Sequence, residues 1–168
     1  MLNKEQAAKA CEDKGRNYVE STVTQLNFTF EDYDYSRNDF TAENKKGTKF
    51  YVGEIKGYFN PEHPRYHNKA WKRGEWQYYP DYMIDYDKLQ AICEKGKENN
   101  RTPILIAAYH DTTLIWNLNE VEWESTGTWR WVNKCGVDYG TKERSFEAFL
   151  PFKDAYEIKD NKWVRYGS

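Results

Sequence analysis

The run Ile-Leu-Ile-Ala-Ala-Tyr at residues 104–109 constrains the fold more than any other segment of this chain. Six consecutive apolar or aromatic residues, entered through Pro103, are typical of a strand that is buried on both faces. Residues 112–118 are expected to form its hairpin partner across His110 and Asp111. A strand of this kind needs a covering layer on each side, so we predict an α/β layer architecture.

The N-terminal region predicts a helix and then a strand. Asn3 can cap a first helix, and Gly15 is expected to end it. Residues 18–35 are rich in Thr, Val, Phe and Tyr, and they predict a strand. Leu26, Phe28 and Phe30 alternate within this segment, as strand residues with one buried face do.

A hairpin and a second helix are expected next. Residues 39–43 predict a strand, the Asn-Lys-Lys-Gly sequence at 44–47 predicts a turn, and residues 49–58 predict the returning strand. Residues 59–80 contain three prolines and predict a long irregular insertion. Asp85 can cap a helix that runs to about Lys97. The apolar side of that helix would carry Leu89, Ile92, Cys93 and Gly96.

The C-terminal third predicts further strands. We expect Trp123, Trp129 and Trp131 to be core or sheet-face residues. The fold class is therefore α/β, with a central mixed sheet flanked by helices and a β-rich C-terminal extension. The 168 residues fit one domain over residues 1–168.

Charge and hydropathy limit the partners. Lys and Arg number 25 and Asp and Glu number 27, so a net charge of -2 gives no overall attraction to a polyanion. Nucleic-acid contact must therefore be local. No apolar stretch approaches the roughly 20 residues that span a bilayer, and the first residues lack the apolar run of a signal peptide. We expect a cytoplasmic protein that does not enter a membrane.

Three charged residues around the predicted hairpin carry the chemistry. Glu54 and Lys56 are two apart in a strand, so they share a face while Ile55 points to the other layer. Asp39 lies on the neighbouring strand, where its carboxylate can reach the space beside Glu54. Two carboxylates this close repel each other unless a hard cation lies between them.

Mg²⁺ suits such a pair, because it binds one or two protein carboxylates and keeps waters and substrate phosphates as its other ligands. The carbonyl of Ile55 could add a ligand, and Mn²⁺ is a substitute. Lys56 could then orient the attacking water and stabilise charge in the transition state. The pattern predicts a hydrolytic phosphodiester site.

Asp39, the hairpin and the Glu54-Ile55-Lys56 triplet resemble the PD-(D/E)xK nuclease superfamily, which has the restriction-endonuclease-like fold. The predicted element order is also similar to the αβββαβ core of that family, and small phage and bacterial members show a later paired strand. The resemblance implies Mg²⁺-dependent cleavage of DNA, with Asp39 and Glu54 as metal ligands and Lys56 as the catalytic lysine. Lys88 would match a basic residue of the following helix.

The resemblance leaves several assignments open. Asp34 competes with Asp39 as the first metal acid, and Glu5, Glu12 and Glu20 are equal candidates for a first-helix glutamate. Many relatives form a homodimer to cut both strands. The choice between DNA and RNA, and between endonuclease and exonuclease, is also open.

The predicted insertion is a candidate DNA contact. Cations and indole rings alternate there, which suits phosphates and unstacked bases. The residues that we expect to bind nucleic acid are Lys69, Trp71, Lys72 and Arg73.

Two other function classes fit the sequence. The first is a non-catalytic nucleic-acid-binding or assembly module on the same fold, because a fold does not guarantee an active site. The second is a carbohydrate-active protein, suggested by 14 tyrosines, seven tryptophans and many carboxylates. No pair of carboxylates has a spacing that singles it out for sugar chemistry, so this class ranks lower.

Overall fold

A computed structural model describes residues 13, 15–31, 39–57, 81–108, 113–132 and 143–166. A helix over residues 15–22 opens the described part, and α2 follows the first four strands. The remaining elements, in chain order, are β1 Leu26–Phe30, β2 Phe40–Asn44, β3 Phe50–Gly57, β4 Asp81–Asp85, α2 Tyr86–Asn99, β5 Thr102–Ala108, β6 Thr113–Asn117, the 3-10 turn Glu124–Thr126, β7 Thr128–Val132, β8 Glu143–Pro151, the 3-10 turn Phe152–Asp154, β9 Tyr156–Lys159 and β10 Lys162–Arg165.

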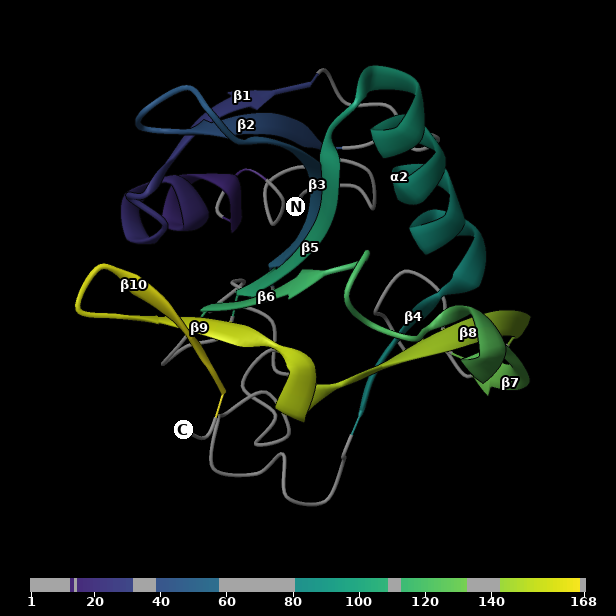
Figure 1. Cartoon of the computed structure of the whole chain (residues 1–168). Coiled ribbons are helices and arrows are strands. Elements are labelled where there is room, and N and C mark those ends of the chain that lie inside the picture. The colour runs from purple at the N-terminus through teal and green to yellow at the C-terminus, as the bar shows by residue number, and fades with distance from the viewer. Residues whose placement is uncertain are drawn as a thin grey trace, which may run out of the picture.

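The strands form two sheets. The larger is mixed, with the order β1-β2-β3-β5-β6-β9-β10, and the smaller has the order β4-β8-β7. Strands β3 and β5 pair in parallel, and the other pairs of the large sheet are antiparallel. The predicted fold class is confirmed: a central mixed sheet lies between helices, and a β-rich region follows it (Figure 1).

Each face of the large sheet has its own apolar core. The helix over residues 15–22 covers one face, where Val19 and Val23 pack with Ile55, Ile104 and Ile106. The other face is covered by α2 and by the smaller sheet, which lie across the large sheet from that first helix in Figure 1. Six buried residues along β5 confirm that this strand is covered on both faces.

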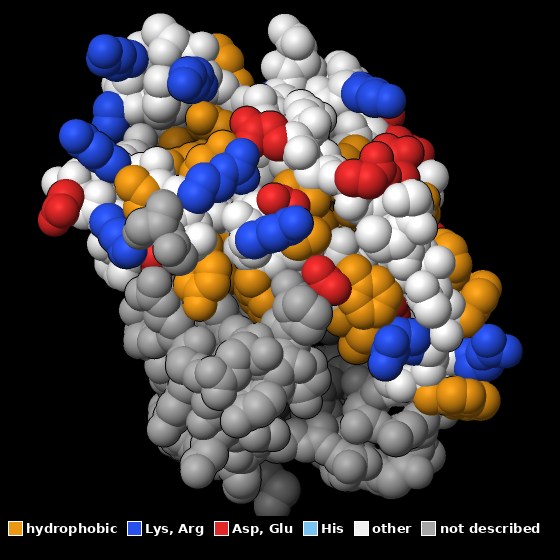
Figure 2. All heavy atoms as spheres, turned by 60° about the horizontal axis from the view of Figure 1, so that its bottom comes forward, with side chains coloured by type: hydrophobic (Ala, Val, Ile, Leu, Met, Phe, Trp, Pro, Cys, Tyr) orange, Lys and Arg blue, Asp and Glu red, His pale blue; other side chains and the backbone are white. Residues whose placement is uncertain are grey.

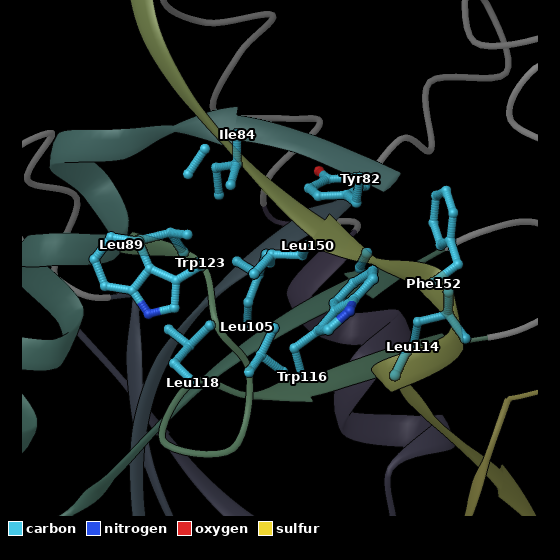
Figure 3. Close-up of a cluster of buried hydrophobic side chains, with 14 of the residues drawn as sticks. Tyr82, Ile84, Leu89, Leu105, Leu114, Trp116, Leu118, Trp123, Leu150 and Phe152 are labelled. Atoms are coloured by element: carbon cyan, nitrogen blue, oxygen red, sulfur yellow. The ribbon is translucent and has the colours of Figure 1, made fainter. Parts of the chain in front are cut away.

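The second core joins the two sheets. Figure 3 shows Leu105 and Trp116 of the large sheet facing Tyr82 and Leu150 of the small one. The Trp116 indole N–H donates to the Pro151 carbonyl at 2.9 Å, so its polar atom is satisfied inside the core. This core fixes β4, and therefore the start of α2, against the large sheet.

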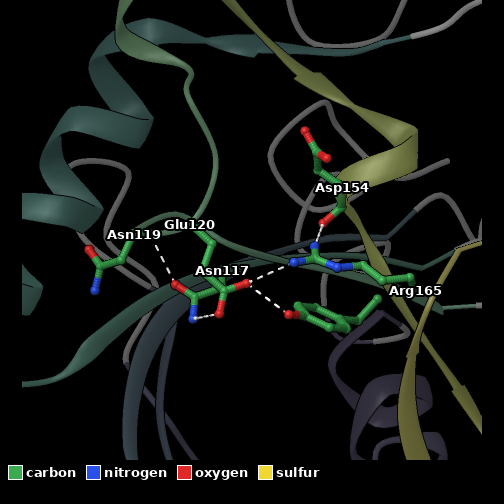
Figure 4. A network of polar contacts seen from close by, with 6 residues as sticks. Asn117, Asn119, Glu120, Asp154 and Arg165 are labelled. Carbon is green, nitrogen blue, oxygen red and sulfur yellow. Dashed lines mark hydrogen bonds and ion pairs between the residues drawn. The ribbon is translucent and has the colours of Figure 1, made fainter.

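A polar network fastens the last hairpin. Glu120 accepts from the Tyr156 hydroxyl at 2.8 Å and pairs with Arg165 at 3.3 Å (Figure 4). Arg165 also donates to the Asp154 carbonyl at 2.6 Å, and its guanidinium lies 4.2 Å from the centre of the Tyr156 ring. The hydrogen bond to Glu120 raises the pKa of Tyr156.

Two expectations about the N-terminal region are wrong. The helix continues past Gly15 to residue 22, and the strand begins only at Leu26. Val19 and Val23 are fully buried four residues apart, and the Thr22 hydroxyl donates to the Tyr18 carbonyl at 2.8 Å. Burial at helical spacing therefore outweighs the strand preference of the β-branched residues.

Other expectations were confirmed. The β2–β3 hairpin forms, with Phe40 opposite Gly53. Helix α2 begins where Asp85 accepts from the Asp87 N–H at 3.0 Å.

Strand β4 was not predicted, and the insertion at residues 59–80 lies outside the described residues. No helix in the described ranges is long and apolar enough to cross a membrane.

Candidate metal and phosphodiester site

Glu54 is a carboxylate held inside the protein. It projects from β3 on the face opposite Ile55, toward α2, and its side chain is 3% exposed. Two ammonium groups reach the same carboxylate oxygen: Nζ of Lys56 at 2.9 Å and Nζ of Lys88 at 2.6 Å from Oε1. A buried carboxylate needs such partners, because losing its hydration is costly.

The second oxygen of this carboxylate is different. Oε2 of Glu54 is buried and has no hydrogen-bond partner among the described residues. Leaving a buried acceptor unpaired costs about 1–3 kcal/mol, and more when it is charged. An unsatisfied carboxylate oxygen beside two lysines is therefore a place where a cation or a donor from a substrate would be stabilised.

Backbone pairing positions Asp39 next to Glu54. Its N–H donates to the Gly53 carbonyl at 2.9 Å, and its Oδ2 accepts from the Ile55 N–H at 2.8 Å. The β2–β3 register pairs Phe40 with Gly53, so one step further along the ladder brings Asp39 opposite Glu54.

Gly53 allows the strands to approach closely at this point. A Cβ there would collide with the Ile104 carbonyl oxygen and lie 2.8 Å from the Phe40 ring. Phe40 instead covers the glycine from the neighbouring strand, where the ring is fully buried. The glycine before the triplet thus serves the packing that sets the positions of Asp39 and Glu54.

Arg16 is a site residue that sequence reasoning missed. Its guanidinium lies 3.7 Å from Oδ1 of Asp39, donates to the Glu31 carbonyl at 2.9 Å and lies 5.4 Å from the centre of the Phe30 ring. Its spacing of three and seven residues from Val19 and Val23 would have placed it on the buried side, had the helix been extended past Gly15. Glu20, one of the open candidates, is exposed.

The donor atoms fit a hard cation. Oε2 of Glu54 and the Asp39 carboxylate are oxygen donors, and the Ile55 carbonyl points to the same edge as its N–H, which is the edge where Asp39 lies. Within the described ranges no group of three or more His, Cys, Asp and Glu side chains could hold a metal. Two carboxylates and a carbonyl suit Mg²⁺ or Mn²⁺, which keep several waters.

A second Glu-Ile-Lys triplet provides an internal comparison. Glu157 on β9 is 1% exposed, and Lys159 lies 3.0 Å from its Oε1, much as Lys56 does from Glu54. Strand β6 places Leu114 opposite Glu157, whereas Asp39 accompanies Glu54. Unlike Oε2 of Glu54, neither Glu157 oxygen is a buried atom that lacks a hydrogen-bond partner. The two triplets therefore differ in their neighbours, not in their own residues.

The remaining predicted site residues are not among the described residues. Asp34, Glu5 and Glu12 fall outside the described residues. The same is true of the four expected nucleic-acid contacts: Lys69, Trp71, Lys72 and Arg73.

The tail tryptophans occupy both of the expected positions, the core and a sheet face. Trp123 is buried against Tyr86, whereas Trp129 is 59% exposed and Trp131 is 66% exposed. Both exposed rings lie on β7. This is an edge strand of the small sheet, and among the described strands it pairs with β8 alone. Trp129 and Trp131 are therefore exposed sheet-face residues, and Trp123 is the core residue.

Comparison with known proteins gives little more. No family model matches the chain, and no curated protein matches it significantly. Among solved structures, it is similar to Hjc, a Holliday junction resolvase from Archaeoglobus fulgidus. That similarity has 9% sequence identity and a TM-score of 0.45 over 81% of each chain. A likeness of this extent assigns no residue and no activity.

Proposed function

We propose that this protein is a metal-dependent nuclease that hydrolyses DNA phosphodiester bonds, with a site of the PD-(D/E)xK type. The observation that carries the proposal is the buried, unpaired Oε2 of Glu54, with two ammonium groups on the other oxygen and Asp39 at its side. An acid pair with one oxygen left free is the arrangement that a hard cation completes.

Asp39, Glu54 and the Ile55 carbonyl are the residues that would hold Mg²⁺. When bound, the ion supplies charge stabilisation and an activated water for hydrolysis. Asp39 is held in place, because the Ile55 N–H donates to its Oδ2 and the Arg16 guanidinium lies near its Oδ1. A site whose ligands are already held loses less conformational entropy when it binds a cation.

The lysines have separate roles. Lys88 lies in the first turn of α2, and its 2.6 Å contact fixes the Glu54 carboxylate so that Oε2 keeps one orientation. Lys56 is near the C-terminal end of β3, and its side chain is 31% exposed, against 29% for Lys88. We assign the catalytic charge to Lys56, which follows Glu54 on the same strand face, because its ammonium can offset negative charge growing on the phosphoryl oxygens.

The local charge favours an anionic substrate. Lys56, Lys88 and Arg16 contribute three positive charges, and Asp39 and Glu54 contribute two negative ones. The described site is thus positive by one charge before any cation binds, although the whole chain has a net charge of -2. Local attraction of this kind is what a phosphodiester requires from a weakly acidic protein.

Calorimetry with Mn²⁺ and cleavage of mixed DNA substrates with Mg²⁺ test the proposal. Glu54→Gln and Asp39→Asn keep the size of each side chain and remove one charge, so both should lose Mn²⁺ binding and cleavage while the protein stays folded. Glu157→Gln is the matched control and should bind Mn²⁺ as the wild type does. Binding of Mn²⁺ that survives Glu54→Gln would place the metal elsewhere and refute the assignment. Metal and DNA binding without cleavage would favour the non-catalytic module.

A further inference from the structure

Two indole rings are exposed on one face of an edge strand. Trp129 and Trp131 are two residues apart on β7, so they share a face, and β7 is the last strand of the small sheet. Their exposed fractions are 59% and 66%. Neither ring belongs to either apolar core of the described residues, and exposed apolar groups of this kind mark interaction sites.

The same face carries a cation. Arg144 on β8 is directly opposite Trp131, and its guanidinium lies 5.6 Å from the centre of the Trp129 ring. The nearby carboxylates of β8, Glu143 and Glu147, pair with Val132 and Thr128 and therefore fall on the opposite face. This face of the β7–β8 pair thus presents two rings and one positive charge.

Side-chain contacts connect this face to Glu54. The Trp129 ring packs on Phe146 at 5.3 Å, and Phe146 packs on Tyr86 at 4.8 Å between ring centres. Tyr86 begins α2, and Lys88, two residues later, contacts Glu54. Figure 2 shows Lys, Arg and hydrophobic side chains next to one another at the right edge, the side on which β7 lies in Figure 1.

We propose that Trp129, Trp131 and Arg144 form a stacking site for unpaired bases, so that the substrate is DNA with a single-stranded segment next to the bond that is cut. The inference rests on the proposed nuclease function and deepens it. Every base has a face that can stack on an indole, and a guanidinium adds contact with bases and phosphate. An apolar protein partner would instead have to desolvate Arg144 without offering it an anion.

Binding measured without cleavage tests the stacking site. Fluorescence anisotropy in EDTA compares a fluorescein-labelled oligothymidylate with a blunt duplex, both against the full chain. Trp131→Ala should weaken binding of the single strand by about five- to a hundredfold, the range expected when one stacked base is lost. Trp131→Phe should restore most of that binding, and duplex binding should change little. Because Trp131 is mostly exposed, thermal melting should be near that of the wild type.

Phe50 offers a matched control. It is 41% exposed, and the Arg101 guanidinium lies 5.6 Å from its ring centre, yet it is at the start of β3, while Glu54 and Lys56 are near its end. Phe50→Ala should leave oligothymidylate binding unchanged. Equal weakening by Phe50→Ala and Trp131→Ala, or no weakening by either, would overturn the stacking site.

The two proposals can fail separately. Cleavage that depends on Glu54, together with single-strand binding that is unaffected by Trp131→Ala, leaves the nuclease and removes the stacking site. Single-strand binding that requires Trp131, in a protein that cuts no DNA with any divalent cation, removes the nuclease and supports a binding surface. Light scattering that shows a dimer lost only in Trp131→Ala, with oligonucleotide binding intact, would make β7 a self-association edge and overturn the proposal.

Discussion

The pair Lys56→Ala and Lys159→Ala separates catalysis from stability most sharply. Each lysine follows a buried glutamate by two residues and contacts its Oε1, at 2.9 Å and 3.0 Å. We expect Lys56→Ala to reduce cleavage strongly with little loss of stability. We expect Lys159→Ala to reduce stability and to leave the rate of cleavage by folded protein unchanged.

The catalytic magnitude follows from one charge near a phosphate. Two unit charges about 4 Å apart in an effective dielectric of about 20 interact by about 4 kcal/mol. Removing one preorganised charge stabiliser costs enzymes about 10²–10³ in kcat. Lys56→Ala should therefore slow cleavage on the order of a hundredfold or more, and Lys56→Arg should restore little because the guanidinium fork places its charge differently.

The stability magnitudes follow from the partners that remain. Lys88 stays on Oε1 of Glu54 when Lys56 is removed, so that loss should be about 1 kcal/mol or less. Glu157 is 1% exposed and loses an ammonium partner in Lys159→Ala. Breaking a fully buried pair costs about 3–5 kcal/mol, but the Lys159 side chain is 44% exposed, so about 1–2 kcal/mol is expected.

Single-turnover cleavage with Mg²⁺ and urea unfolding measure the two effects on the same preparations. Calorimetry with Mn²⁺ should show that Lys56→Ala keeps most of its metal affinity. Equal rates for the wild type and Lys56→Ala would refute the role of this ammonium. Lys159→Ala could also reduce cleavage as much as Lys56→Ala does. That result would show that the catalytic effect does not depend on which triplet the lysine belongs to.

Two further predictions concern other parts of the chain. Burial, with a contribution from Glu124, raises the pKa of the Cys93 thiol from 9.0 to about 11. Below pH 9, in a variant whose other cysteines are serine, iodoacetamide should modify this thiol about a hundredfold more slowly than a free one, measured by mass spectrometry. The folded thiol stays protonated while the unfolded one ionises, so stability should fall between pH 9 and 11. Neutralising Lys69, Lys72 and Arg73 together should weaken DNA binding and flatten its dependence on salt in anisotropy titrations, and an unchanged slope would remove this segment from the interface.

The sequence predicted the parts of the fold that rest on local signals. Adjacent residues are enough to predict three features: the apolar run of β5, the turn between β2 and β3, and the Asp85 cap of α2. Strand β4 has a weaker signal, because Tyr82 and Ile84 are its only buried residues. Its role becomes visible only when β8 pairs with it.

Other features depend on contacts between distant residues. Thr22 and Val23 are residue types that favour strands. They nevertheless lie at the end of a helical segment, because Val19 and Val23, four residues apart, both pack on the sheet face that carries Ile104. The exposure of Trp129 could not be predicted either, since large aromatic residues are mostly buried and only the sheet order makes β7 an edge. Arg16 reaches Asp39 only because that helix continues.

The two Glu-Ile-Lys triplets show why a motif needs its register. Both place a glutamate on the α2 side of the large sheet with a lysine on one oxygen. The ladder runs from Lys56 through Ala107 and Leu114 to Glu157, so the two triplets lie along one row of the same sheet. Across from Glu157 stands Leu114, which offers no charge. Beside Glu54 stands Asp39, and that neighbour, fixed by the hairpin turn, creates an acid pair that three letters of sequence do not contain.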